Sequence, residues 1–198
     1  AGIKQLASAY GAAQPQLELA NTANISATIK REATGHAINI KANANDSLIK
    51  FGTLFSKPAG EPFSIDAKTL VQLSPTGKPS SVSANSITKV TSNNTPLELN
   101  LNTIYKPEAV RIDLSNFSCC SGTLTFNGAL DLNEQKTFTM AIQGKSFALE
   151  TLMKAFAQAQ SAPITGILEN IVSNSKGNGI DPKQSLVNTT KLNIINGS

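Results

Sequence analysis

Apolar and polar residues alternate one by one over many short stretches of this chain. Ser, Thr, Asn, Asp, Glu or Lys mostly separates two apolar residues, so the apolar positions recur with a period of two. This period is typical of a β-strand with one apolar face and one face in water. The apolar positions are Leu17/Leu19, Ile25/Ala27/Ile29, Ile38/Ile40/Ala42, Phe63/Ile65/Ala67, Leu97/Leu99/Leu101, Val110/Ile112/Leu114, Leu124/Phe126, Leu130/Leu132 and Phe138/Met140/Ile142.

The segments between these stretches are rich in residues that favour turns. Short turns place each strand antiparallel beside the previous one, so the pattern predicts an antiparallel meander in a mainly β protein. The predicted turns are Thr76-Gly77-Lys78-Pro79, Ser92-Asn93-Asn94-Thr95-Pro96, Tyr105-Lys106-Pro107-Glu108, Asn127-Gly128 and Asn133-Glu134-Gln135.

Two segments, 46–55 and 146–160, have apolar residues at helical spacing instead. Asp46 or Ser47 is the expected cap of the first segment and Ser146 that of the second. We predict two or three short amphipathic helices, these two among them, whose apolar stripes cover part of the sheet. The stripes consist of Leu48, Phe51 and Phe55 in the first helix and of Leu149, Leu152, Met153 and Phe156 in the second.

Both helical segments follow an alternating strand and precede a proline that opens another apolar segment, Pro62 in the first case and Pro163 in the second. We interpret residues 36–75 and 136–175 as two copies of a strand, helix, strand unit, with coincidence as the other explanation. At 198 residues the chain is large enough for one substantial domain or two small ones. We treat residues 1–198 as a single β-rich domain.

The apolar face of such a sheet must be covered. Two short helices shield only part of about nine strands, and aromatic residues make up only 5% of the chain, too few for a thick sandwich core. Two solutions stay open: a β-sandwich with a thin core, and a curled sheet whose apolar side is partly open as a groove. The candidate groove residues are Leu97, Leu99, Leu101, Ile112, Leu114, Leu124, Phe126, Leu130, Leu132, Phe138, Met140 and Ile142.

The charge pattern does not favour nucleic-acid binding. The 17 basic and 13 acidic residues give a net charge of +4, but they are scattered, with no basic run longer than Lys30-Arg31. Nucleic-acid-binding surfaces usually cluster their basic residues. No segment approaches the roughly 18 apolar residues of a membrane-spanning helix. The chain begins without a signal peptide, so we expect a mature product or an excised part of a longer protein.

The two cysteines, Cys119 and Cys120, are adjacent. Neighbouring residues of a strand point to opposite faces, and a disulfide between them closes a strained ring. We therefore expect two reduced thiols within a strand. A zinc site is not expected, because zinc-binding cysteines are usually separated by two or more residues.

No residue pattern indicates a catalytic site, and we expect neither an enzyme nor a cofactor. His36, the only histidine, stands where a turn enters a strand, and we expect it on the wet face. No nucleophile elbow, phosphate-binding loop, dinucleotide fingerprint or calcium loop occurs. The acidic residues mostly take wet positions of the strands, where a solvated side chain is the default; they include Glu18, Asp66, Glu98, Asp113 and Asp131.

The last third of the chain carries a more particular pattern. Its parts are the strand 122–128, then Ala129-Leu130-Asp131-Leu132, then a strand-to-helix passage over 138–156, and then Thr165-Gly166 opening a further strand. A small loop, a short helix and a final strand ending in Asn196-Gly197 are expected to follow. Residues 117–197 thereby resemble the C-terminal region of AsmA-like proteins, a bacterial envelope family related to TamB and to repeating β-groove lipid-transfer proteins. One departure is Thr189-Thr190, where a glycine is expected before the final strand.

The resemblance implies a curled antiparallel sheet that offers an apolar channel to phospholipid acyl chains. It also implies a periplasmic domain, anchored to the inner membrane by a segment outside this chain, that supports phospholipid transport and outer-membrane homeostasis. The partners would be phospholipid or another acyl-chain lipid, together with other envelope β-proteins. Two alternatives stay open: an envelope assembly module whose sheet edge pairs with another β-protein, and a closed β-sandwich that binds a surface.

Overall fold

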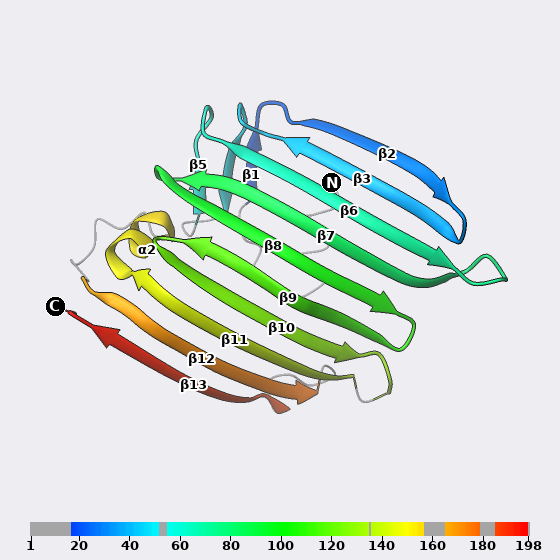
Figure 1. Ribbon diagram of the computed structural model, residues 1–198. Helices are drawn as coiled ribbons and strands as arrows, with labels where there is room; N and C mark the ends of the chain where they lie inside the picture. The colour runs from blue at the N-terminus through cyan, green and yellow to red at the C-terminus, as the bar shows by residue number, and fades with distance from the viewer. Residues whose placement is uncertain (1–16, 52–54, 135, 157–164, 179–184, 198) are drawn as a thin grey trace.

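The computed structural model describes residues 17–51, 55–134, 136–156, 165–178 and 185–197, which form two antiparallel sheets and one α-helix (Figure 1). The prediction of a mainly β chain is confirmed. The small sheet contains β1 (Leu17–Ala20), β4 (Leu48–Phe51) and β5 (Phe55–Lys57). The large sheet contains β2 (Asn24–Glu32), β3 (Gly35–Asn43), β6 (Phe63–Leu73), β7 (Pro79–Ser92), β8 (Thr95–Lys106), β9 (Ala109–Cys119), β10 (Gly122–Asp131), β11 (Thr137–Ala148), β12 (Ile167–Asn178) and β13 (Val187–Ile195).

The ten strands of the large sheet follow the chain order from β2 to β13, with β3 beside β6, and all neighbours are antiparallel. The sheet does not close on itself, because β2 and β13 are its two outer strands. The alternation missed β7, whose 14 residues are mostly Ser, Thr, Asn and Lys, with few apolar side chains. Pairing with β6 and β8 over its whole length makes this polar segment a strand.

The strand register assigns every side chain to one of two faces, because paired residues of antiparallel strands point the same way and successive residues alternate. Most side chains on one face are aliphatic or aromatic, and we call it the apolar face. The other, which carries nearly all charged residues, is the polar face. One residue from each strand marks the apolar face: Ile25, Ile40, Ile65, Val82, Leu99, Ile112, Phe126, Met140, Ile171 and Leu192.

The buried apolar residues of the described chain lie at one end of the large sheet, where β3, β7, β9 and β11 finish. At this end the helix α2 (Leu149–Phe156) lies against β5, β8 and β11, and β5 also lies against β7 (Figure 1). We call it the covered end and the opposite one the uncovered end, since no described element packs on the apolar face there. The buried apolar residues are Ala44, Leu97, Cys119, Cys120, Phe147 and Ala155.

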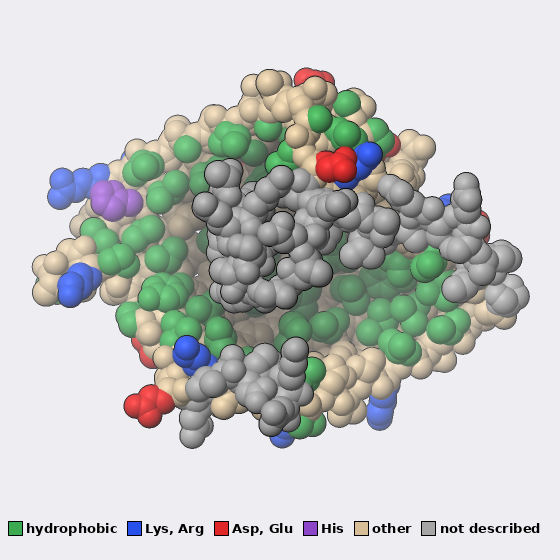
Figure 2. All heavy atoms as spheres, turned by 180° about the vertical axis from the view of Figure 1, so that it is seen from behind, with side chains coloured by type: hydrophobic (Ala, Val, Ile, Leu, Met, Phe, Trp, Pro, Cys, Tyr) green, Lys and Arg blue, Asp and Glu red, His purple; other side chains and the backbone are tan. Residues whose placement is uncertain are grey.

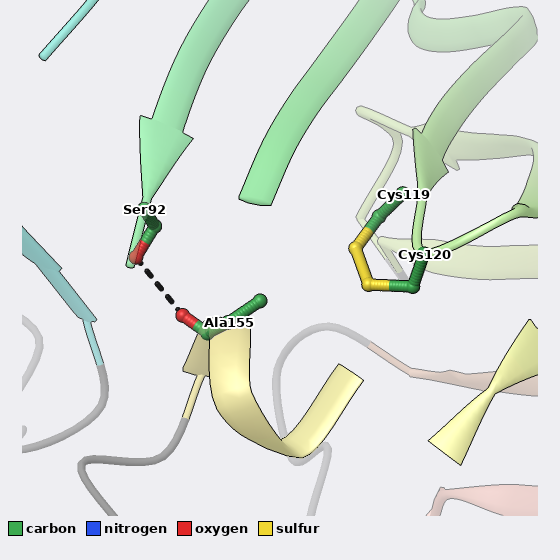
Figure 3. Close-up of a disulfide and its surroundings, with 4 residues drawn as sticks. All are labelled: Ser92, Cys119, Cys120 and Ala155. Atoms are coloured by element: carbon green, nitrogen blue, oxygen red, sulfur yellow. Dashed lines mark hydrogen bonds between the residues drawn. A yellow bond between two sulfur atoms is a disulfide. The ribbon is translucent and has the colours of Figure 1, made fainter. Parts of the chain in front are cut away.

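Two hairpin turns of the large sheet hold α2. The Ser92 hydroxyl lies 2.9 Å from the Ala155 carbonyl oxygen (Figure 3) and 3.0 Å from that of Ser56, so its single proton is shared between the two oxygens. The Asn93 side-chain amide donates to the Lys154 carbonyl. Before the helix, the Ala148 amide donates to the carbonyl of Cys120 in the next turn. These hydrogen bonds fix both ends of α2 to the turns of the large sheet.

The predicted position of this helix is correct, but its predicted start is wrong. Ser146 does not cap it: this residue lies in β11 with φ at +63°, and the pairing with β12 continues on both sides of it. β11 continues to Ala148, and the helix begins at Leu149. The pairing with β12 extends the strand past the sequence signal for a cap. Residues 157–160 of the predicted helix lie outside the described residues.

The helix predicted over 46–55 is wrong. Leu48–Phe51 forms β4, which pairs with β1 on one side and with β5 on the other. The segment contains β-branched and aromatic residues, and pairing on both sides outweighs a helical spacing of only three apolar residues. Both insertions, β4–β5 and α2, nevertheless leave and re-enter the large sheet at the covered end, between neighbouring antiparallel strands.

The turn predicted at Asn127-Gly128 is also wrong. Both residues lie inside β10, opposite Ala141 and Met140 of β11, with a register irregularity against β9. Asn-Gly favours a hairpin turn, but both neighbouring strands pair beyond it, so it stays inside β10, opposite a bulge of β9.

The expectation of reduced cysteines is wrong as well, because Cys119 and Cys120 are joined by a disulfide (Figure 3). Cys119 is the last residue of β9, whereas Cys120 and Ser121 form a two-residue turn with φ at +57° and +64°. The alternation of side chains along a strand therefore does not apply to this pair. Both cysteines are buried, in one cluster with Phe147 of β11 and Ala155 of α2.

Lys57 ties the small sheet to the large one. Its side chain is fully buried, and its Nζ donates to the carbonyl oxygens of Ala44, Asn45 and Ser47 at 2.8, 2.7 and 2.6 Å. Burial lowers the pKa of Lys57, and the carboxylates of Glu61 and Asp46 offset part of that effect. Three accepting carbonyls around one nitrogen match the three donors of an ammonium group.

Candidate functional site

The apolar face of the large sheet is the largest feature that the described chain leaves without a matching layer. Figure 2 shows this side of the molecule hollowed and lined by hydrophobic side chains, with most Lys, Arg, Asp and Glu residues at its margins. The second described sheet has three strands against ten, so it covers only a part. Between the covered end and the uncovered end, the aliphatic and aromatic side chains that line the described face are half-buried or exposed.

Most candidate groove residues lie together on the apolar face. They come from β8 to β11 and follow one another across the sheet through the strand register. Leu97 is buried at the covered end, whereas Met140, near the start of β11, is 38% exposed. The candidates on this face are Leu97, Leu99, Leu101, Ile112, Leu124, Phe126, Leu130, Phe138, Met140 and Ile142.

Leu114 does not lie on the apolar face with the other candidate groove residues. A bulge in β9 interrupts the alternation after Ile112, and Leu114 is 68% exposed beside residues of the polar face such as Leu70 and Ile104. The buried Ser115 hydroxyl fixes the bulge, since it accepts from the Asn102 amide at 2.9 Å and donates to the Asp113 carbonyl at 2.8 Å. Ser115 thus points to the apolar face, opposite Phe126 of β10. Leu132, the other exception, lies beyond the end of β10.

The predicted lid residues divide between the helix and the small sheet. Phe55 in β5 and Leu152 in α2 pack against the buried cluster of the covered end. Leu48 and Leu149 are half-buried, and Met153 is 39% exposed. The side chains of Phe51 and Phe156 lie outside the described ones. Ala155, which the helical stripe omitted, is the fully buried residue of α2.

The sequence reading missed two features of the apolar face. Its candidate list omitted β2 and β3, although Ile29 of β2 is on this face and 71% exposed. It also placed His36 on the wet face, whereas the register puts His36 on the apolar face opposite Arg31 and Val71. A count of the alternation from Ile38 and Ile40 back to residue 36 would have found this, because all three have the same parity.

The charged residues of the polar face form solvated pairs. Lys41 lies 3.8 Å from Asp66, and Lys89 lies 3.4 Å from Glu98, each pair across neighbouring strands. On α2, a hydrogen bond and the positive charge of Lys154 lower the pKa of Glu150. Among the described residues, no group of three or more His, Cys, Asp or Glu side chains is placed to hold a metal ion.

Comparison with protein-family models, with curated proteins and with solved structures gives no match. Within the described part of the chain, no helix has the length and apolar character needed to cross a membrane. The geometry of the apolar face is therefore the basis on which a function can be inferred.

Proposed function

We propose that the apolar face is an open groove that binds the acyl chains of lipids. The observation that carries the proposal is the contrast between the two ends of this face. The fully buried apolar side chains gather at the covered end, whereas those of the remaining length keep contact with solvent. Soluble proteins rarely leave a contiguous apolar surface of this extent unless it binds a partner or a ligand.

The size of the face suits a fatty chain. Ten strands spaced about 4.8 Å apart span about 43 Å. A lipid chain in one leaflet of a bilayer occupies about 15 Å, half of the hydrocarbon thickness. Each methylene group moved from water onto apolar surface contributes about 0.8 kcal/mol. Because many weak contacts share this energy along the face, a chain can bind without any single strong site and can slide along it.

The likeness to AsmA-like proteins extends the proposal to a setting. In that reading the chain is part of a periplasmic protein, anchored to the inner membrane, that carries or conducts phospholipid and supports the outer membrane. The hollowed apolar face and the ten-stranded antiparallel meander agree with such a role.

Site-specific photo-crosslinking in cells tests the proposal. A crosslinking residue at Leu99, Ile112, Phe126 or Met140, all on the apolar face, should capture lipid. Matched controls at Asn100 and Thr125 lie beside Leu99 and Phe126 along the same strands but point to the polar face. Equal capture at the two sets of positions would contradict the proposal.

A role in assembly is the second candidate, because each outer strand of the large sheet has only one neighbour among the described strands. The side chains of β2 and β13 are exposed along their lengths. An exposed edge can accept a strand from another β-protein. The same crosslinker at Thr28 of β2 or Thr189 of β13 would then capture protein, and lipid capture at Ile112 would be absent.

A further inference from the structure

The distribution of charge on the large sheet has one exception. In the ten strands, every Lys, Arg, Asp and Glu side chain whose face follows from the strand pairing points to the polar face, with one exception. The exception is Arg31 of β2. Glu169 stands at the register irregularity of β12 and accepts a hydrogen bond from Asn193, which is on the polar face. Arg31 is directly opposite His36 of β3, the only histidine of the chain. The two basic side chains that break the apolar pattern are therefore cross-strand neighbours.

Nothing in the described structure neutralises this pair. Glu32, the nearest acidic residue in the sequence, points to the polar face and lies 3.5 Å from Lys30. Within the described residues, Arg31 takes part in no ion pair, and neither side chain makes a recorded hydrogen bond. A guanidinium and an imidazole side by side offer several N–H donors to one anionic group.

The position of the pair is the uncovered end of the apolar face. Next to His36 across the sheet come Val71 and then Val82, and Ile29 and Ile38 are the next pair toward the covered end. Histidine and Lys or Arg side chains meet at one margin of the hollowed face in Figure 2. The donors thus adjoin an apolar surface on the side away from α2.

We infer that Arg31 and His36 bind the phosphate of an anionic acyl lipid whose chains lie along the apolar face toward the covered end. The inference rests on the proposed lipid binding and adds a headgroup site and an orientation to it. A phosphate next to Arg31 can form charge-assisted hydrogen bonds with the guanidinium and a further one with His36. Among the described residues of the covered end, Lys57 donates to three backbone carbonyls and Lys154 pairs with Glu150.

The test compares two soluble short-chain lipids with identical acyl chains, dihexanoyl phosphatidylglycerol and dihexanoylglycerol, by calorimetric titration of the purified protein. The wild-type protein should bind the phospholipid about tenfold more tightly. Arg31→Gln should remove this preference and leave dihexanoylglycerol binding unchanged, and Arg31→Lys should restore part of it. The matched control is Lys30→Gln, which makes the same change in charge one residue away on the polar face.

The outcomes separate the inference from the function on which it rests. Equal affinity of the wild-type protein for both lipids would overturn the headgroup site and leave acyl-chain binding intact. An equal loss in Lys30→Gln and Arg31→Gln would also overturn it, because a general effect of net charge would then explain the preference. Failure to bind either lipid would contradict acyl-chain binding itself, and with it the site. Displacement of the phospholipid by millimolar inorganic phosphate would assign the site to free phosphate instead.

Discussion

At the scale of single residues, glycine on the apolar face lets neighbouring side chains close over the backbone. Gly144 of β11 is buried, and a Cβ atom there would lie 2.5 Å from Leu124 Cδ2 and 2.9 Å from Ile171 Cδ1. We predict that Gly144→Ala lowers the free energy of unfolding by about 1–2 kcal/mol, because both side chains must move. Urea denaturation followed by circular dichroism measures this change. Gln143→Ala, on the polar face, is the control, and equal stability of the two variants would contradict the packing.

Ser92 is the residue that joins three elements. Its hydroxyl proton is shared by carbonyls of β5 and α2, and its side chain is fully buried. Ser92→Ala should lower the free energy of unfolding by about 1–2 kcal/mol, since a carbonyl at the end of α2 loses its donor. It should also speed hydrogen exchange in α2. Ser81→Ala removes an exposed hydrogen bond to Gln72 and should change neither quantity.

At the scale of elements, the small sheet depends on the buried ammonium of Lys57. We predict that Lys57→Met lowers the free energy of unfolding by about 2–3 kcal/mol, because three backbone carbonyls lose a charged donor. Lys50→Met on the adjacent β4 is the control, since the Lys50 side chain is 39% exposed and its ammonium lies 3.8 Å from Glu18. Denaturation midpoints of the two variants provide the comparison, and similar losses would show that Lys57 has no special role.

The elements also show what the sequence alone could predict. Strands with regular alternation, such as those around Ile40 and Leu99, were predicted correctly because one face meets water. The predictions failed where a neighbouring strand decided the structure: Leu48–Phe51 became a strand, and Asn127-Gly128 stayed inside one. A bulge does not show in the alternation of the sequence, so the prediction placed Leu114 on the wrong face. Most candidate groove residues nevertheless lie on the apolar face, since the face of a residue in a regular strand depends on parity alone.

At the scale of the whole molecule, the fold places its helix and its small sheet at one end of a long apolar face. In this arrangement, the residues that stabilise the fold and those proposed to bind lipid lie in different parts of the apolar face. Buried contacts at the covered end hold the elements together, and the described apolar side chains of the rest of the face keep contact with solvent. A substitution such as Ile112→Asn in the uncovered part should therefore reduce acyl-lipid binding severalfold while changing stability less than Phe147→Ala, which opens a cavity in the buried cluster. Lipid titration and urea denaturation of both variants measure the two effects, and Ile112→Asn with unchanged lipid binding would contradict the separation.

The central claim is that acyl chains occupy the apolar face, and mass spectrometry of organic extracts from the purified protein tests it most directly. The protein is purified without detergent, and a Met140→Glu variant, with a charge in the middle of that face, is treated in the same way. The account predicts acyl lipid in near-stoichiometric amounts with the wild-type protein and severalfold less with the variant. Acyl lipid at the same background level in both preparations would contradict the claim.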